Sequence, residues 1–454
     1  MESGLSKKDS GWKEEARVLL RLAGPIALSN LGFMGMATVD IFLLGHLHTD
    51  ALAVAGIAHS MAFFFLSFGI GMIQGLDPIL SQAVGAEDPR QFRLGMQRGL
   101  ILALVVGGGI GLLLIPGALW HRLLGQPKEL EGQVVLYLRC LAPGMPFWLL
   151  FNLFARALQA HHQTRPIVVS VFFGNLLNFG LDLWLIYGGM AVPPMGAVGS
   201  AIATTLVRGL MVLILLWLAW PVLGPSFSPW LREVFQLKAF LRLIRLTGAS
   251  ALQVFLEGGA FSVVMFLVGR FGAGAAAGHQ IALNLASLTF MVPLGLGAAT
   301  SVRVGNGIGK GRRTQVLDAA KIGIGLAVLF MGCSALLFVL APRLIASLYT
   351  DDPAVLSLAA SLLPLAGFFQ VFDGLQAVSG GILRGTGDTR TPMLGHLGGF
   401  WILGIPMGML FSGPLNMDVP GLWWGLVLAL ALCSMFLVWR VRVTLRRPLS
   451  RVKV

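Results

Sequence analysis

The stretch RLTGASALQVFLEGGAFSVVMFLVG, residues 245–269, is apolar over a length that crosses a bilayer, yet it carries Glu257 near its middle. A helix needs roughly 20 residues to span the hydrocarbon core of a membrane, which is about 30 Å thick. A charge at the centre of such a helix is costly unless it is paired, hydrated or protonated. Glu257 is therefore a candidate functional residue.

The composition of the whole chain is that of an integral membrane protein. Hydrophobic residues make up 56% of the 454 and charged residues 12%, whereas a soluble domain carries about 25% charged residues. The apolar runs are too long for barrel strands and do not alternate with period two. They predict an all-α fold of twelve transmembrane helices near 18–45, 51–81, 93–119, 131–156, 166–188, 195–220, 243–270, 276–303, 315–342, 355–384, 392–413 and 419–443.

Basic residues gather on every second predicted loop. They cluster at Arg90–Arg98, Arg156–Arg165 and Arg312–Arg313, and again in the carboxy-terminal tail. This positive-inside asymmetry predicts a multi-pass protein of the cytoplasmic (inner) membrane with both termini in the cytoplasm. The net charge of +13 is thereby explained by topology, and we expect the lipid bilayer and no nucleic acid as a partner.

The opening stretch has a counterpart in the first half of the chain. At a shift of 224 residues RLAGPIALSNLGFMGMATVDIFLLG (21–45) lies over it, and 14 of the 38 positions from Arg21 to Ala58 are identical. ALQAHHQTR (157–165) lies over ILRGTGDTR (382–390) at a shift of 225. Repeated six-helix halves are a transporter architecture. We expect an amino-terminal lobe at 1–220, a cytoplasmic linker at 221–242, a carboxy-terminal lobe at 243–443 and a basic tail at 444–454.

The intramembrane polar residues differ between the two halves, because Glu257 lies over Phe33 and Asp40 lies over Val264. In the second half, amide side chains accompany two acids at helical spacing. Such a group can coordinate a monovalent cation or share a proton. The candidate cation site of the carboxy lobe comprises Glu257, Asp373, Gln253, Gln280, Asn284 and Gln370.

The first half offers a second candidate site. Asn175, Asn178 and Asp182 follow one another at i, i+3 and i+7 on one predicted helix, and Asp40 lies on another. Together they would make a site for a cation or a proton. At both sites the alternative is that each acid is satisfied by local hydrogen bonds and only packs helices.

Motifs of other functions are incomplete. GNGIGKG (305–311) lacks the Ser or Thr of a phosphate-binding loop, and the histidines of AHHQTR have no further ligands at metal spacing. Cys140, Cys333 and Cys433 stand singly. We therefore expect no enzyme, no cofactor and no metal beyond a possible monovalent cation.

The chain resembles the multidrug and toxic compound extrusion (MATE) family, specifically its NorM-type branch, over essentially its full length. The resemblance is carried by GPIALSNLGFMGMATVDIFLLGHL with Pro25 and Asp40, by LEGGAF with GHQIALNLASLTFMVPLGLGAATSVRVGNGIGKG, and by DGLQAVSGGILRGTGDTRTP. It implies two six-helix bundles in a V around a central cavity. It also implies a secondary antiporter in which inward Na+ or H+ drives efflux of organic, often cationic, drugs and toxins.

The same resemblance assigns roles to residues. Glu257 and Asp373 would form the carboxy-lobe cation site, Asp40 with Asn178 and Asp182 the amino-lobe site, and Pro25 a bend in the first helix. Aromatic faces suit cation–π contacts with varied ligands. We expect the substrate cavity to include the phenylalanines Phe261, Phe290 and Phe369.

The identity of the coupling ion is open at the level of sequence. Some NorM-type members have a tyrosine where this chain has Phe369, and Phe290 also lacks a hydroxyl that a Na+ ion could use. The resemblance favours Na+ and the missing hydroxyls favour H+. We expect Na+ at the carboxy-lobe site, with proton coupling through Asp40 as the alternative.

Two other functions are compatible with the chain. A flippase or exporter of lipid-linked glycans or another amphipathic metabolite would need a strongly cationic cavity, whereas this sequence offers intramembrane acids. A membrane-embedded transferase would need a polar catalytic loop, and the sequence shows none. We expect a monomer whose partners are small-molecule organic cations and drugs.

The basic loops make a topological prediction. Single cysteines placed in the Arg90–Arg98, Arg156–Arg165 and Arg312–Arg313 loops of a cysteine-free background should react with an impermeant maleimide only from the cytoplasmic side. Labelling of any of them from outside intact cells would overturn the orientation.

Overall fold

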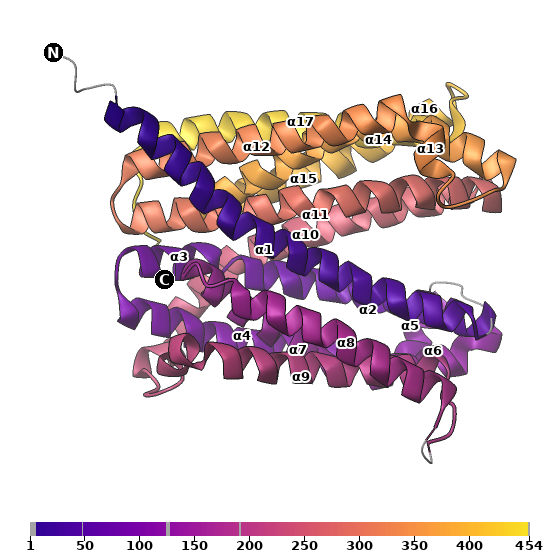
Figure 1. The fold of residues 1–454 in the computed structure, drawn as a ribbon, viewed down its shortest axis with the longest axis horizontal. Coiled ribbons are helices and arrows are strands. Elements are labelled where there is room, and N and C mark those ends of the chain that lie inside the picture. Colours follow the sequence, from indigo (N-terminus) through magenta and orange to yellow (C-terminus); the bar gives the residue numbers. More distant parts are fainter. Residues whose placement is uncertain (1–5, 48, 124–127, 190–191, 453–454) are drawn as a thin grey trace. The chain divides into compact units, whose positions relative to one another are not determined.

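The computed structural model describes residues 6–47, 49–123, 128–189 and 192–452, and helices make up most of these residues (Figure 1). The described ranges contain no strand, only an isolated bridge between Gly189 and Val192. Within them, 11 helices are long and apolar enough to cross a membrane, and counting one bent pair as a span gives 12. The predicted all-helical, twelve-span fold is confirmed.

The bent pair consists of α6 (Glu131–Leu141), preceded by the 3₁₀ turn η1 (Lys128–Leu130), and α7 (Gly144–Ala160). The two segments meet at an angle of 43°. Pro143 lies at the break, where its ring and its missing N–H interrupt the helical hydrogen bonds. The fourth predicted span is therefore a broken helix.

The described chain divides into two compact units. The amino unit comprises residues 28–76 and 88–247, and the carboxy unit comprises residues 6–27, 77–87 and 248–452. Helix α1 (Ser6–Gly45) runs through Pro25 and passes from the carboxy unit into the amino unit two residues later. The amino unit also takes in the predicted linker.

Beyond its part of α1, the amino unit is built from long helices joined by short turns. Its elements are α2 (Thr49–Gln74), α4 (Pro89–Leu114), α5 (Gly117–Leu123), η1, α6, α7, α8 (Arg165–Tyr187), α9 (Ala197–Leu223), the 3₁₀ turns η2 (Gly224–Ser226) and η3 (Arg232–Phe235), and the beginning of α10 (Leu237–Gly269).

The carboxy unit holds the rest of α10 and the second-half helices. These are α11 (Ala273–Gly309), α12 (Arg313–Leu340), α13 (Pro342–Ala346), α14 (Pro353–Thr386), α15 (Arg390–His396), the π-helical segment η4 (Leu397–Gly404), α16 (Ile405–Ser412) and α17 (Asp418–Arg446). Short α3 (Asp77–Gly85) from the first half of the sequence joins them. Helices α12, α14 and α17 run side by side in this unit (Figure 1).

The duplication is preserved in the backbone of the turns. Glu87 and Gly311, which are 224 residues apart, have φ angles of 52° and 67°. His162 and Gly387, which are 225 apart, have φ angles of 61° and 91°. Equivalent positions thus share the left-handed conformation, which glycine adopts most readily. The second half has glycine at both places.

A buried amide holds the linker against α4. The Gln97 side chain donates to the carbonyls of Ser226 and Pro229, both at 3.0 Å, and accepts from the Leu231 amide at 3.0 Å. These bonds satisfy backbone groups that have no helical partner. The linker is therefore an ordered part of the amino unit.

Helix α3 and the end of α11 approach so closely that glycine is required on both. A Cβ on Gly85 would lie 2.6 Å from the Asn306 Cα, and a Cβ on Gly309 would lie 2.7 Å from the Ala86 nitrogen. The Asn306 amide donates to the Ser81 carbonyl at 2.7 Å. Gly85 and Gly309 are 224 residues apart, so the duplicated segments pack on each other through equivalent residues.

We predict that Gly309→Ala destabilises the protein by about 1–3 kcal/mol, because its methyl group would meet rigid backbone. Gly325→Ala is the matched control: Gly325 lies inside α12 with nothing within 4 Å of its would-be Cβ. This change should be neutral or stabilise by up to about 1 kcal/mol. Thermal unfolding in detergent measures both, and equal shifts of the two variants would contradict the close approach.

Candidate functional site

The carboxy unit contains a buried cluster centred on Glu257 of α10. The Glu257 Oε1 atom accepts a hydrogen bond from the Gln376 amide of α14 at 3.3 Å. Its Oε2 atom lies 3.4 Å from Nε2 of His396, at the end of α15. His396 is completely buried and also contacts the Gln376 amide. Both carboxylate oxygens of Glu257 therefore have a polar partner.

The orientation of His396 is set by the backbone. Its Nδ1 atom lies 2.7 Å from the Pro392 carbonyl, which can only accept, so Nδ1 carries a hydrogen. That leaves Nε2 as the atom whose protonation can change. Without a proton, Nε2 accepts from the Gln376 amide; with one, it donates to Glu257, and the Gln376 amide must turn its NH2 group away from the ring. The site thus accommodates both states of the ring.

Asp373 and Gln370 lie on α14 and Gln253 lies on α10, and Asp373 is close enough to Glu257 to feel its charge. Gln370 is fully buried, and its Oε1 atom accepts from Thr289 at 2.6 Å and from Ser334 at 3.0 Å. Within the described ranges, several buried polar atoms have no hydrogen-bond partner: Asp373 Oδ1, Gln253 Oε1, Gln370 Nε2 and Gln376 Oε1. Such atoms are costly unless a ligand, water or proton satisfies them.

The two predicted amides of α11 have other surroundings. Gln280 is exposed. Asn284 accepts a hydrogen bond from the Tyr349 hydroxyl at 3.0 Å. Their membership of the carboxylate cluster remains a prediction, since the hydrogen bond of Asn284 is to Tyr349 and the Gln280 side chain is exposed.

The three predicted cavity aromatics differ in burial. Phe369 is 2% exposed and packs edge-on against Phe261 at 5.9 Å and against Trp423 at 5.8 Å. Phe261 and Phe290 are half-buried. Phe369 is thus part of an aromatic core beside the acids, while the other two rings keep accessible surface.

A second cluster lies in the amino unit. Asn178 and Asp182 on α8 are completely buried, and Asp182 lies beside Asp40 of α1. Thr204 of α9 donates to Asp40 Oδ2 at 3.4 Å. Asp182 and Asn178 both face the Asp40 carboxyl, but within the described part of the chain none of their side-chain N and O atoms makes a hydrogen bond of regular geometry. The polar face of α8 that carries Asn178 and Asp182 therefore lies beside Asp40 in the structure.

Asn175 has a different role from its neighbours on α8. Its amide donates to the Val171 carbonyl at 2.8 Å, within the same helix. Its Oδ1 atom would lie 3.5 Å from a Cβ on Gly35 of α1. Asn175 is therefore placed where α1 and α8 pack together.

Each cluster also contains a basic residue that was not predicted from the sequence, His396 in the carboxy unit and Arg208 in the amino unit. Arg208 lies on α9 one turn after Thr204 and is only 8% exposed. Its guanidinium stands 5.3 Å from the Trp148 ring centre and feels the charge of Asp40. Ionisable residues inside apolar spans are rare, so both were available as sequence signals.

The MatE family model matches residues 25–184 and 249–410, which cover both repeats and both carboxylate clusters. The chain belongs to the MatE family. This confirms the resemblance seen in the sequence: the protein is a transporter of the MATE type and not an enzyme.

Curated relatives match over nearly the whole chain. The multidrug resistance protein NorM of Vibrio parahaemolyticus is 32% identical, with 95% of this chain and 96% of the relative covered. NorM of Burkholderia vietnamiensis is 35% identical over 92% of each chain. MdtK of Pectobacterium atrosepticum, another multidrug resistance protein, is 30% identical over 96% and 97%.

Solved structures share the fold. The eukaryotic MATE transporter AtDTX14 superposes with a TM-score of 0.86 at 23% identity, over 95% of this chain and 96% of the other. An outward-facing multidrug resistance MATE transporter gives a TM-score of 0.85 at 20% identity, over 96% and 97%.

Proposed function

We propose that this chain is a secondary antiporter that exports organic, often cationic, drugs and toxins in exchange for inward cations. The observation that carries the proposal is a buried carboxylate cluster within each unit, at Glu257 and Asp373 and at Asp40 and Asp182. The NorM and MdtK relatives, which are named multidrug resistance proteins, support the substrate class. The acids suit cationic cargo better than the anionic head of a lipid-linked glycan.

We further propose that the coupling ion is the proton. Glu257 already has the Gln376 amide and the His396 ring at its two oxygens. A Na+ ion at Glu257 would stand beside the imidazole and would gain no hydroxyl from Phe369. A proton needs no ligand shell and can reside on Glu257 or on Nε2 of His396. These contacts favour H+ where the sequence alone favoured Na+.

In this mechanism a proton and a cationic substrate compete for the same charge. With its carboxylates ionised, the carboxy unit attracts an organic cation, and Phe261 and Phe290 offer it apolar and cation–π contacts. Proton arrival at Glu257 removes the attraction, so the substrate leaves. Each ligand favours a different conformation only by the difference in its binding free energy between conformations.

The setting proposed for this cycle is the inner membrane, with both termini in the cytoplasm and the chain acting as a monomer. The basic loops support the orientation. The cargo enters the cycle from the side that holds the termini.

We predict that His396→Gln lowers transport at least about tenfold while the protein still folds. Glutamine can bond to Glu257 but cannot hold a mobile proton. His279→Gln is the matched control: His279 is equally buried on α11 but accepts a hydrogen bond from Trp423 at 3.1 Å. Efflux of a cationic dye from proteoliposomes measures both. A fully active His396→Gln protein would exclude the ring from coupling.

The coupling ion itself is testable in the same vesicles. We expect a pH gradient without Na+ to drive dye transport, and a Na+ gradient with the pH gradient collapsed to fail. Glu257→Gln and Asp373→Asn should abolish the proton-driven flux without loss of expression, because neutralisation relieves desolvation. Asp351→Asn, an exposed carboxylate outside the helices, should be active. Transport driven by Na+ alone would refute proton coupling and leave antiport standing.

A further inference from the structure

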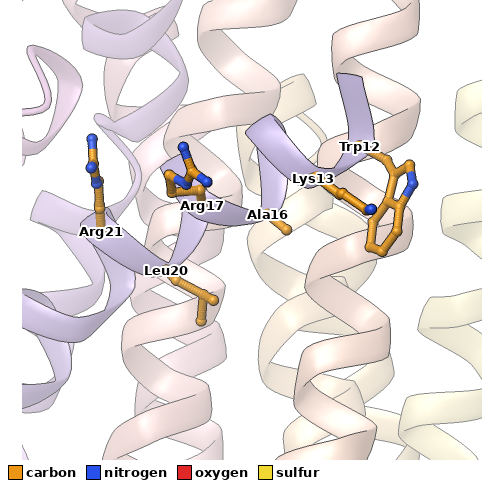
Figure 2. A pocket seen from close by; sticks show the side chains of 6 residues that line it. All are labelled: Trp12, Lys13, Ala16, Arg17, Leu20 and Arg21. Atoms are coloured by element: carbon orange, nitrogen blue, oxygen red, sulfur yellow. The ribbon is translucent and has the colours of Figure 1, made fainter. Parts of the chain in front are cut away.

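The outer face of the first part of α1 carries two adjacent rows of side chains (Figure 2). Lys13, Arg17 and Arg21 recur at intervals of four residues, which places them on one face of the helix. The neighbouring row is apolar. The two rows line a shallow hollow of about 540 Å³, formed by Trp12, Lys13, Ala16, Arg17, Leu20 and Arg21.

The opposite face of the same segment holds it in place. Glu15 forms a two-pronged ion pair with Arg303 of α11, at 2.7 and 2.5 Å, and both side chains are largely shielded. Leu19 and Leu22 are buried in the core shared with α11 and α12. The part of α1 that lines the hollow is therefore anchored to the rest of the carboxy unit.

The cations around the hollow are free to bind a ligand. Lys13, Arg17 and Arg21 are exposed, and the structure gives none of them an ion pair or hydrogen bond with another described side chain. Trp12 and Leu20 are 50% and 53% exposed, and the Lys13 ammonium lies 5.9 Å from the Trp12 ring centre. Glu14, also exposed, does not line the hollow.

The length of α1 places this face at the membrane surface. The apolar candidate span Gly11–Gly45 has 35 residues and is thus about 52 Å long at 1.5 Å per residue, whereas the hydrocarbon core is about 30 Å thick. The charges from Lys13 to Arg21 mark the end that lies outside, and no charged residue follows until Asp40. Arg21 therefore lies near the boundary of the hydrocarbon.

We propose that this hollow binds the headgroup of an anionic phospholipid from the leaflet in which α1 begins. Lys13, Arg17 and Arg21 would neutralise the phosphodiester, since basic residues beside a membrane attract anionic lipids. Leu20 would contact the glycerol and the first methylenes of the chains, and Trp12, about 12 Å further out along the helix, would lie among the headgroups, where amphipathic aromatic rings are favoured. A soluble anion would leave these two apolar side chains in water, so the lipid fits both rows.

The test uses the full-length protein in phosphatidylcholine vesicles that contain brominated phosphatidylglycerol or brominated phosphatidylcholine, whose bromines quench tryptophan fluorescence. The part of the signal that Trp12→Phe removes reports this site among the 11 tryptophans. We expect brominated phosphatidylglycerol to quench that part at a mole fraction at least about tenfold lower than the mole fraction of brominated phosphatidylcholine that gives the same quenching. Equal quenching by the two lipids would overturn the proposal.

Charge variants separate this site from general surface attraction. The triple variant Lys13→Gln, Arg17→Gln, Arg21→Gln should lose the preference. The matched triple Lys310→Gln, Arg312→Gln, Arg446→Gln removes three other exposed cations and should retain it. If the first triple does not fold, Arg17→Gln against the charge-preserving Arg17→Lys makes the same comparison. A preference that survives removal of the three cations would refute the site.

A final arm distinguishes a lipid from a soluble anion. Inorganic phosphate, added against chloride at equal ionic strength, should not relieve the quenching by brominated phosphatidylglycerol. Relief by phosphate would show a site for soluble anions and overturn the lipid assignment. None of these readouts depends on drug export or on the coupling ion.

Discussion

The high free energy of a bare charge inside hydrocarbon is the constraint on which the rest of this structure depends. It accounts for the long uncharged helices, and it limits where the few intramembrane acids can lie. In each unit the acids are gathered on helices that pack together, and a basic side chain stands nearby. Arg208 has this position in the amino unit and His396 in the carboxy unit.

The duplication shows how one architecture serves two different clusters. Left-handed turn residues recur at equivalent positions, such as His162 and Gly387, so the course of the backbone is held by constraints common to both halves. The polar side chains are under no such constraint. Glu257 has phenylalanine as its counterpart and Asp40 has valine, so each half has acquired its own set while the packing of the helices was retained.

Hydropathy alone is enough to predict the spans, because a helix in lipid must be apolar over a defined length. The same physics draws attention to Glu257, Asp40, Asp182 and Asp373, which the structure places in two buried clusters. Partners are harder to predict: His396 reaches Glu257 from a helix that begins 133 residues later, at Arg390. The placement of α3 beside α11 was also beyond prediction, since it depends on the absence of side chains at Gly85 and Gly309.

The two basic residues have different chemistry, and this difference separates the two clusters. A guanidinium does not give up its proton in a protein, so Arg208 holds a constant charge beside Asp40. An imidazole titrates near neutral pH in water and can be neutral or charged. With Nδ1 fixed on the Pro392 carbonyl, His396 can gain or lose one proton at Nε2 without moving. In the carboxy cluster the base that contacts Glu257 can therefore change the net charge along with the acids, whereas in the amino cluster the base beside Asp40 cannot. On this reasoning the carboxy unit is the better suited to the exchange of a proton for a cation, and the amino unit is suited to a fixed electrostatic balance.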